Sequence, residues 1–159
     1  MIRQSTPDDA TALIAVAEAS GLFEPEQTAE LAHMLDQHFN GVTDSHDYWF
    51  TYDDNKPVGV AYAAPERMTE GTWNLYLIAI HPEHQRQGRG KALLTHVEKI
   101  LTERGERVLL VETSGTKSFE YVRAFYRKSG YDEEARIRDF YTDGVDKIIF
   151  RKALCNPVT

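Results

Sequence analysis

The stretch LYLIAIHPEHQRQGRGKALL, residues 75–94, joins an apolar, strand-like run to a helical pattern through a short basic turn. Backbone N–H groups stay unpaired at a helix N-terminus, and the helix dipole favours negative charge there. Gly88 and Gly90 lack a Cβ and let the backbone approach a ligand closely. Three basic side chains among residues 86–91 add positive charge. The turn is therefore predicted to hold a phosphate or a diphosphate.

Two familiar phosphate-binding motifs do not fit this turn. A nucleoside-triphosphate P-loop, aligned on Gly90-Lys91, would have Gln85 in place of its first glycine and Ala92 in place of its metal-binding hydroxyl. A dinucleotide-binding fingerprint that starts at Gly88 would have Leu93 in place of its third glycine. What fits is Gln/Arg-x-x-Gly-x-Gly/Ala directly after a strand, although ordinary turns with solvated arginines can also carry two glycines.

This turn resembles the one with which the GNAT superfamily of N-acetyltransferases grips the diphosphate of acetyl-coenzyme A. A second segment, FYRKSGY at residues 125–131, is similar to the family's Phe-Tyr-x-x-x-Gly-Phe/Tyr motif, a helix that Gly130 closes before a strand starts. The opening at residues 2–10, a short strand and then a helix start, is also typical of the family. The resemblance extends from Ile2 to Lys152 and is strongest to ribosomal-protein N-terminal (alanine) acetyltransferases.

Hydrophobic periodicity predicts a mixed α/β chain. The predicted strands are residues 2–5, 48–53, 56–64, 72–80, 107–113, 131–141 and 146–152, and the predicted helices are residues 8–20, 26–39, 90–103 and 120–129. Hairpin turns join neighbouring strands in both halves, whereas a helical crossover precedes residues 107–113. This order predicts a central mixed, mostly antiparallel sheet of about seven strands flanked by about four helices, in a single domain over residues 1–159.

Composition agrees with one globular domain and argues against several other classes of protein. Apolar residues make up 42% and charged residues 27% of the 159 residues, which is ordinary for such a domain. No apolar run approaches the ~18 residues that span a bilayer, and no signal-peptide pattern opens the chain. The net charge of −7 argues against nucleic-acid binding and weakly favours a cationic acceptor. Cys155, the only cysteine, permits no internal disulfide, so we expect a cytoplasmic protein without a membrane partner.

The resemblance implies acetyl-coenzyme A as co-substrate and no metal ion. The strand at residues 72–80 is expected to splay from the strand at residues 107–113, so that pantetheine pairs with main-chain groups that Ile78 and Ile80 leave unpaired. A simple core strand is the alternative, and both descriptions can hold together. The expected cofactor-binding residues are Ile78, Ala79, Ile80, Arg86, Gln87, Gly88, Arg89, Gly90, Lys91 and Tyr126. Residues 117–119 lack the asparagine with which many members bind the pantetheine arm.

Acetyl transfer to an amine requires a neutral amine and a proton for the departing thiolate. An alkylamine with a pKa of about 10 is mostly protonated at neutral pH, so a base or a water chain assists. Tyr126 matches the family's tyrosine beside the thioester sulfur and is the expected catalytic acid, with a tyrosine that packs on the sheet as the alternative. Glu112 resembles the catalytic base of the ribosomal-protein enzymes, yet the segment from Glu112 to Tyr126 is longer here. A solvated strand end is the alternative for Glu112.

The acceptor is left open between a small-molecule amine and a peptide or protein amine. In this architecture the substrate site is expected to be lined by Phe23, Glu24, Trp73, Asn74 and Tyr141. Glu24 or Asp139 can attract an amine, although surface acids often have no such role. Glu112 and the strand at residues 136–141 favour a peptide or protein amine.

Two other classes of function are alternatives to an acetyltransferase. A non-catalytic acyl-coenzyme A binding module, acting as a sensor or scaffold, would keep the same turn, and so would a nucleotide-phosphate binder. The presence of both Tyr126 and Glu112 favours the enzyme. A homodimer is a common state in this superfamily, and the sequence allows one.

Overall fold

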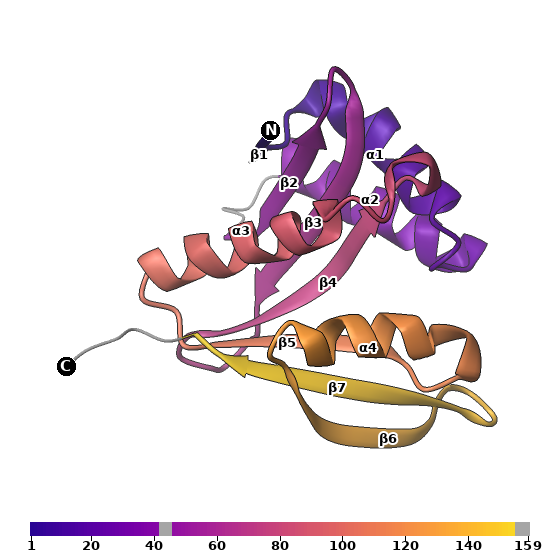
Figure 1. Cartoon of the computed structure of the whole chain (residues 1–159). Helices are drawn as coiled ribbons and strands as arrows, with labels where there is room; N and C mark the ends of the chain where they lie inside the picture. The colour runs from indigo at the N-terminus through magenta and orange to yellow at the C-terminus, as the bar shows by residue number, and fades with distance from the viewer. Residues whose placement is uncertain (42–45, 155–159) are drawn as a thin grey trace. The chain divides into compact units, whose positions relative to one another are not determined.

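The computed structural model describes residues 1–41 and 46–154 (Figure 1). The strands are β1 (Ile2–Gln4), β2 (Tyr48–Asp53), β3 (Pro57–Pro65), β4 (Thr72–Ile80), β5 (Val108–Ser114), β6 (Asp132–Thr142) and β7 (Val145–Ala153). The helices are α1 (Ala10–Ala19), α2 (Pro25–Asn40), α3 (Arg89–Glu103) and α4 (Glu120–Lys128), and short 3-10 helices are η1 (Pro7–Asp9), η2 (Pro82–His84) and η3 (Lys117–Phe119). Each predicted strand and helix is present, and Cys155 lies outside the described residues. In the part of the chain that is described, no helix is long and apolar enough to cross a membrane.

The seven strands form one sheet in the order β1-β2-β3-β4-β5-β7-β6. β4 and β5 are parallel, and β1–β2, β2–β3, β5–β7 and β6–β7 are antiparallel pairs. The parallel pair reflects the crossover through α3. The predicted mixed, mostly antiparallel sheet with seven strands and four helices is confirmed. The β4–β5 register runs from Thr72 opposite Val108 to Leu75 opposite Val111, and the splay beyond these positions stays a prediction.

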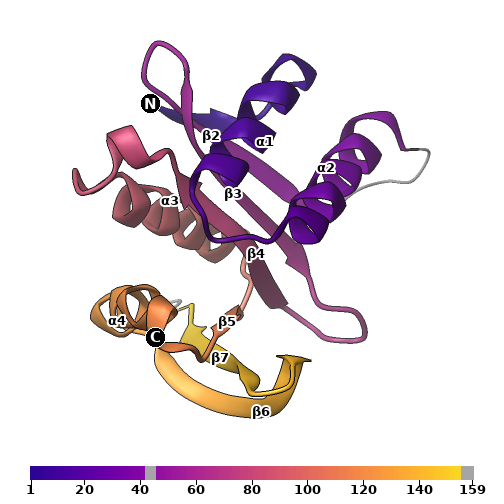
Figure 2. The ribbon, with the colours of Figure 1, turned by 90° about the vertical axis from the view of Figure 1, so that its right-hand side faces the viewer.

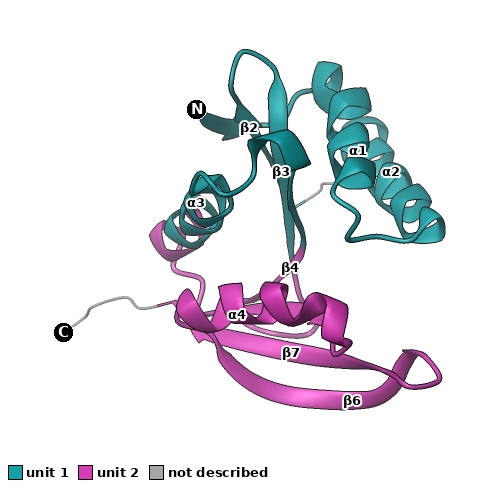
Figure 3. Ribbon diagram, turned by 45° about the vertical axis from the view of Figure 1, so that its right-hand side comes forward, with its two compact units in different colours: residues 1–64, 77–99 teal, residues 65–76, 100–159 magenta. Residues whose placement is uncertain are grey.

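The chain divides into two compact units (Figure 3). Unit 1 holds residues 1–64 and 77–99, and unit 2 holds residues 65–76 and 100–159. Strand β4 contributes to both units, since its first residues belong to unit 2 and its last residues to unit 1. The single domain expected from the sequence stays a prediction.

Unit 1 has helices on both faces of its strands. Figure 2 shows α1 and α2 on one face of β2 and β3, with α3 on the other face. Trp49 and Phe50 are neighbours on β2 and therefore point to opposite faces. The Phe50 ring lies 4.8 Å from the His96 ring of α3. The core on the side of α1 and α2 consists of Leu13, Val16, Ala17, Leu31, Leu35, Trp49, Val60, Tyr62, Leu77 and Ala79.

An ion-pair group fixes the start of the chain to β2 in unit 1. Arg3 Nη1 lies 2.7 Å from Asp9 Oδ2, and Arg3 Nη2 lies 3.0 Å from Asp53 Oδ2. Asp9 also accepts a 2.8 Å hydrogen bond from the Thr6 main-chain N–H, just before η1. The hydrogen bonds from Arg3 lower the pKa of Asp9 to about 2. The first helix of the chain is thereby anchored to the sheet edge.

In unit 2, helix α4 covers one face of the strands. Leu109, Val111 and Thr113 of β5 are buried, whereas the alternate residues of the strand are only half-buried. The buried positions face α4, since the ring of Tyr126 on α4 lies 5.7 Å from the ring of Phe150, the residue opposite Val111. Figures 1 and 2 show α4 lying along β5 and β7. The half-buried face is the one that carries Glu112.

Candidate active site

The turn between η2 and α3 presents main-chain N–H groups at residues 86–91 that have no partner in the described part of the chain. Within the described residues, no hydrogen bond starts from the main-chain N–H groups of residues 86–91. The first hydrogen bond of α3 runs from the Ala92 N–H to the Gly88 carbonyl, at 3.0 Å. Arg86 and Gly88 have left-handed φ angles of 63° and 77°. Such residues curl successive N–H groups into a concave nest that suits an anion.

Arg89 holds the turn in place with its side chain. Its Nη2 lies 2.8 Å from Asp54 Oδ2, and its Nη1 donates to the His84 carbonyl at 3.3 Å and also to Gln87 Oε1. The guanidinium lies 5.7 Å from the centre of the Tyr52 ring. The sequence predicts Arg89 as a cofactor contact, whereas the structure gives its guanidinium an anchoring task. A ligand at this turn would therefore meet the main-chain N–H of Arg89.

The open side of the turn carries unengaged positive charge. Arg86 and Lys91 are exposed, and their side chains form no ion pair or hydrogen bond with another described residue. A Cβ built on Gly88 would meet no atom within 4 Å, so the turn is open there and the left-handed φ is what requires glycine. Gly90 lies in the first turn of α3 and is half-buried.

The end of β4 is tied to the turn. Gln85 Nε2 donates a 2.9 Å hydrogen bond to the Ile80 carbonyl. The expectation that this carbonyl is unpaired is therefore wrong, because a side chain of the turn reaches back to it. Ala79 belongs to the core of unit 1, and Ile78 is half-buried. The tie fixes the turn relative to the last residues of the strand.

Tyr126 of α4 has a buried ring and an unengaged hydroxyl. The residue is 3% exposed, and its ring centre lies 5.7 Å from the ring centres of both Tyr131 and Phe150. Its hydroxyl has no hydrogen-bond partner among the residues that the structure describes. Burial raises the pKa of the Tyr126 hydroxyl well above its ordinary value of about 10. The side chain is therefore a neutral proton donor at physiological pH.

Glu112 of β5 has a partner on each carboxylate oxygen. Lys147 Nζ lies 2.7 Å from Glu112 Oε1, and Asn74 Nδ2 donates to Glu112 Oε2 at 2.9 Å. The Glu112 side chain is nevertheless 27% exposed. A merely solvated strand end does not describe this carboxylate, because it is held in place by two neighbours and can still be reached.

Glu112 and Tyr126 belong to opposite faces of the unit 2 strands. The β5–β7 register places Glu112 opposite Ile149 and Val111 opposite Phe150. Residues directly opposite share a face, and successive side chains alternate. Because Tyr126 contacts Phe150, its ring lies on the α4 face, whereas the Glu112 carboxylate lies on the other face. The two side chains are therefore separated by the strands of unit 2.

A polar group that we name the Asn74 cluster surrounds Glu112. It consists of Glu66, Asn74, Tyr76, Glu112 and Lys147. Asn74 Nδ2 bridges the two carboxylates, donating to Glu66 Oε1 at 3.0 Å and to Glu112 Oε2 at 2.9 Å. The Tyr76 hydroxyl donates to the same Glu66 Oε1 at 3.2 Å. Asn74 itself is 1% exposed.

Of this cluster, the sequence predicts only Asn74 and Glu112. Tyr76 had a detectable signal, since it follows Asn74 by two residues on a predicted strand and so shares its face. Glu66 and Lys147 carried no such signal. Glu66 follows the last residue of β3, and Lys147 reaches Glu112 through the pairing of strands that are distant in the sequence.

Trp73 and Asn74 are neighbours on β4 and point to opposite faces. Trp73 lies opposite Leu109, on the α4 face, and is 2% exposed. Its Nε1 donates to Glu106 Oε2 at 2.8 Å, and the Arg104 guanidinium lies 5.6 Å from its ring. Trp73 is therefore a core residue, and strand alternation keeps it away from the face on which Asn74 and Glu112 lie.

Tyr141 lies within an irregular stretch of β6. The register between β6 and β7 shifts between Ile137 and Thr142. Asp139 lies within this bulge with a left-handed φ of 56°. Its carboxylate accepts a 2.7 Å hydrogen bond from the Gly144 N–H. Asp139 therefore shapes the hairpin end, and its expected attraction for an amine stays a prediction.

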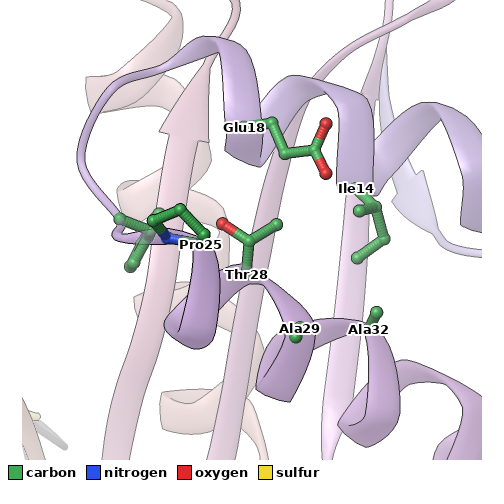
Figure 4. A pocket seen from close by; sticks show the side chains of 7 residues that line it. Ile14, Glu18, Pro25, Thr28, Ala29 and Ala32 are labelled. Atoms are coloured by element: carbon green, nitrogen blue, oxygen red, sulfur yellow. The ribbon is translucent and has the colours of Figure 1, made fainter.

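Phe23 and Glu24 lie between α1 and α2. Phe23 helps to line an open, mostly apolar groove of about 360 Å³ between these helices. Figure 4 shows the groove, whose further lining residues are Ile14, Glu18, Pro25, Thr28, Ala29 and Ala32. The main-chain N–H of Glu24 donates to Gln27 Oε1 at 2.8 Å, and Glu24 is the N-cap of α2. Glu24 thus has a helix-capping position in unit 1.

Comparisons with known proteins identify the family. The Acetyltransferase (GNAT) family matches residues 12–131. The crystal structure of a Desulfovibrio desulfuricans protein assigned to the GNAT family of acetyltransferases superposes with a TM-score of 0.91 at 34% identity. That match covers 98% of this chain and 99% of the other. The chain belongs to the GNAT acetyltransferase family.

Two further matches extend this comparison, one in sequence and one in fold. The ribosomal protein bS18-alanine N-acetyltransferase of Escherichia coli K12 is 36% identical over 77 residues, which are 47% of this chain and 51% of the relative. The chain therefore spans about half the length of the curated relatives it matches. An aminoglycoside 6'-N-acetyltransferase solved with coenzyme A has a TM-score of 0.77 at 15% identity, covering 100% of this chain and 99% of that one, and shares the fold. The family expected from the sequence is confirmed.

Proposed function

We propose that the protein, acting as one domain over residues 1–159, transfers the acetyl group of acetyl-coenzyme A to a primary amine. The observation that carries the proposal is the row of unpaired main-chain N–H groups at residues 86–91, curled by two left-handed residues at a helix N-terminus. Membership of the acetyltransferase family supports the same conclusion.

The diphosphate of the co-substrate binds to the N–H groups of residues 86–91. The side chains of Arg86 and Lys91 add unengaged positive charge around it. The pantetheine arm pairs with main-chain groups of residues 78–80, except for the Ile80 carbonyl that Gln85 already occupies. Acetyl-coenzyme A supplies an activated acetyl thioester, and no metal ion is part of the proposal.

Glu112 and Tyr126 carry the two proton transfers. The amine nitrogen bonds to the acetyl carbon as the bond from that carbon to sulfur breaks. The Glu112 carboxylate takes the proton that the amine gives up, and the Tyr126 hydroxyl gives a proton to the departing sulfur. The opposite faces of these two side chains support this division, because the amine and the thioester then approach from different sides.

The acceptor is a small-molecule amine or a peptide amine. The likeness to a ribosomal-protein alanine acetyltransferase supports a peptide N-terminus, and the fold shared with an aminoglycoside acetyltransferase supports a small amine. A cytoplasmic location completes the proposal, supported by a sequence with a single cysteine.

Release of free coenzyme A from acetyl-coenzyme A tests the proposal, measured over a panel of primary amines and of peptides with N-terminal alanine. We expect release that depends on the acceptor, and coenzyme A binding by calorimetry that is tighter than ATP binding with magnesium. Cofactor binding without release for any acceptor would instead favour the non-catalytic acyl-coenzyme A module. Tighter magnesium-dependent ATP binding would favour a nucleotide binder.

A further inference from the structure

The Asn74 cluster holds an unbalanced negative charge on the half-buried face of unit 2. Glu66 and Glu112 contribute two negative charges and Lys147 contributes one positive charge, which leaves a net charge of −1 (−2 + 1). Lys147 lies against Glu112, whereas Glu66 forms no ion pair with another described residue. A half-buried carboxylate that forms no ion pair favours a cationic ligand.

The cluster also contains two acceptor atoms that receive no hydrogen bond from any residue that the structure describes. Carboxylate oxygens only accept, so the Asn74 NH₂ group must be the part of the amide that faces Glu66 and Glu112. This leaves Asn74 Oδ1 buried and without a partner in the described part of the chain. Glu66 Oε2 likewise receives none there, because Asn74 and Tyr76 both donate to Oε1. The cluster therefore lacks N–H donors for these two acceptor atoms.

Two partly exposed aromatic side chains lie near the carboxylates of the cluster, Tyr76 at Glu66 and Tyr141 within reach of the charge of Glu112. Tyr76 is 43% exposed and Tyr141 is 40% exposed, and aromatic faces attract cations. Burial, with the charges of Glu66 and Glu112, raises the pKa of Tyr76 to about 12. Burial and the charge of Glu112 raise the pKa of Tyr141 to about 12. Both hydroxyls are therefore neutral at physiological pH. Neither forms a phenolate that would compete with the carboxylates for a cation.

We propose that the Asn74 cluster binds a primary ammonium group of the acceptor, a second positive charge beside the amine that is acetylated. An ammonium group offers three N–H donors and no acceptor, which matches the unpaired Glu66 Oε2 and Asn74 Oδ1. The group held at Glu66 is distinct from the reacting amine, because a protonated nitrogen has no electron pair with which to attack. This inference rests on the proposed acetyl transfer and names its substrate class.

The geometry of the bridge places the two nitrogens near one another. Asn74 Nδ2 lies 3.0 Å from Glu66 Oε1 and 2.9 Å from Glu112 Oε2, so an ammonium at Glu66 is a near neighbour of an amine at Glu112. A chain of a few carbon atoms joins two nitrogens at such a separation. The acceptor is therefore a diamine, or a peptide with an ammonium side chain close to its N-terminus. Glu66 is the residue that determines this specificity.

Calorimetry with butane-1,4-diamine and butan-1-amine tests the inference directly. Glu66→Gln keeps an oxygen that accepts from Asn74 and Tyr76 but removes the charge. We expect it to raise the Kd of the diamine by roughly tenfold to hundredfold and to leave that of the monoamine unchanged. Glu70→Gln, at an exposed acid between β3 and β4, is the matched control and should change neither Kd. Glu66→Lys, which supplies its own ammonium group, should remove the preference for the diamine as well.

Equal binding of the diamine by the wild type and Glu66→Gln would overturn the inference, and so would an equal effect of Glu70→Gln. Because binding is measured without turnover, the two proposals fail separately. Glu66-dependent diamine binding without acetyl transfer contradicts the proposed function alone, whereas acetyl transfer with the same KM for both amines in both proteins contradicts the inference alone. Peptides that begin Ala-Lys and Ala-Gln then show whether the second ammonium comes from a peptide, through a lower KM for Ala-Lys that Glu66→Gln removes.

Discussion

Tyr126 combines a ring that is held by its neighbours with a hydroxyl that no described residue engages. Tyr126→Phe keeps the ring contacts with Tyr131 and Phe150 and removes only the proton donor. We expect kcat to fall by ~10²–10⁴-fold, the usual contribution of general acid–base catalysis, with the Kd of coenzyme A unchanged. Steady-state kinetics and calorimetry measure the two quantities.

Tyr121 provides the control for this substitution, because it lies on the same helix and is 65% exposed. Tyr121→Phe should leave both kcat and Kd unchanged. A kcat near the wild-type value for Tyr126→Phe would remove Tyr126 from the mechanism and would leave it as a core side chain of α4.

Gly88 and Gly105 form a matched pair of residues for testing the turn. Both have a left-handed φ, 77° and 83°, and an added Cβ would meet no atom within 4 Å at either position. Substitution by alanine should cost either site about 1 kcal/mol of unfolding free energy. Only Gly88→Ala should also raise the Kd of coenzyme A, by about tenfold, because it disturbs the alignment of N–H donors that bind a charged group. Denaturant unfolding and calorimetry separate these effects.

An equal loss of coenzyme A affinity in Gly88→Ala and Gly105→Ala would show that general destabilisation is responsible. The turn would then lose its assigned part in binding. Unchanged affinity in both variants would lead to the same conclusion.

At the scale of elements, the attachment of η1 and α1 to β2 depends on pH through Asp9. The folded protein lowers the pKa of Asp9 from 3.8 to about 2, so the unfolded chain takes up the proton first as the pH falls. The lowered pKa of Asp9 contributes about 2 kcal/mol to the free energy of unfolding. This contribution is fully present above about pH 4 and is lost as the pH falls through about 2.

Asp9→Asn removes this contribution at all pH values. We expect the unfolding free energies of the wild type and Asp9→Asn to differ at neutral pH and to converge between about pH 4 and pH 2. Urea unfolding at a series of pH values measures the difference. A gap that stays constant down to pH 2 would show that the ion pair with Arg3 is not its origin.

The elements show which parts of the fold can be predicted from local sequence. The bounds of β2 and β4 were predicted to the residue, because runs rich in aromatic and β-branched side chains end at clear turn signals. The bulge in β6 was not predicted. It depends on the hydrogen bonds of Asp139 to Gly144 and Asp146 across the hairpin, and these have no periodic signature.

The same contrast applies to the candidate site. Glycines and basic residues at a helix start are local features, so the turn at residues 86–91 could be predicted. Glu66 and Lys147 could not, since they reach Glu112 and Asn74 through strand pairing between distant segments. Strand alternation shows that Trp73 and Asn74 point to opposite sides of β4, but it does not show which of the two side chains is turned toward α4. For this reason the sequence could not separate Trp73 from the acceptor side.

For the molecule as a whole, binding and chemistry are assigned to different parts of the chain. The turn belongs to unit 1, and Glu112, Tyr126 and the Asn74 cluster belong to unit 2. Substitutions in the turn should therefore change mainly the Kd of coenzyme A, whereas substitutions of the unit 2 residues should change kcat or acceptor selectivity. The net charge of −7 agrees with an acceptor that carries positive charge.

The central claim is that main-chain N–H groups at residues 86–91 bind the diphosphate of coenzyme A. A titration of the full chain with coenzyme A, followed in ¹H–¹⁵N NMR spectra, tests it most directly. We predict that the amide signals of residues 86–91 shift and saturate at the Kd found by calorimetry, and that pantetheine, which lacks the diphosphate, leaves them in place. Saturation by coenzyme A with these six amide signals unmoved would contradict the claim.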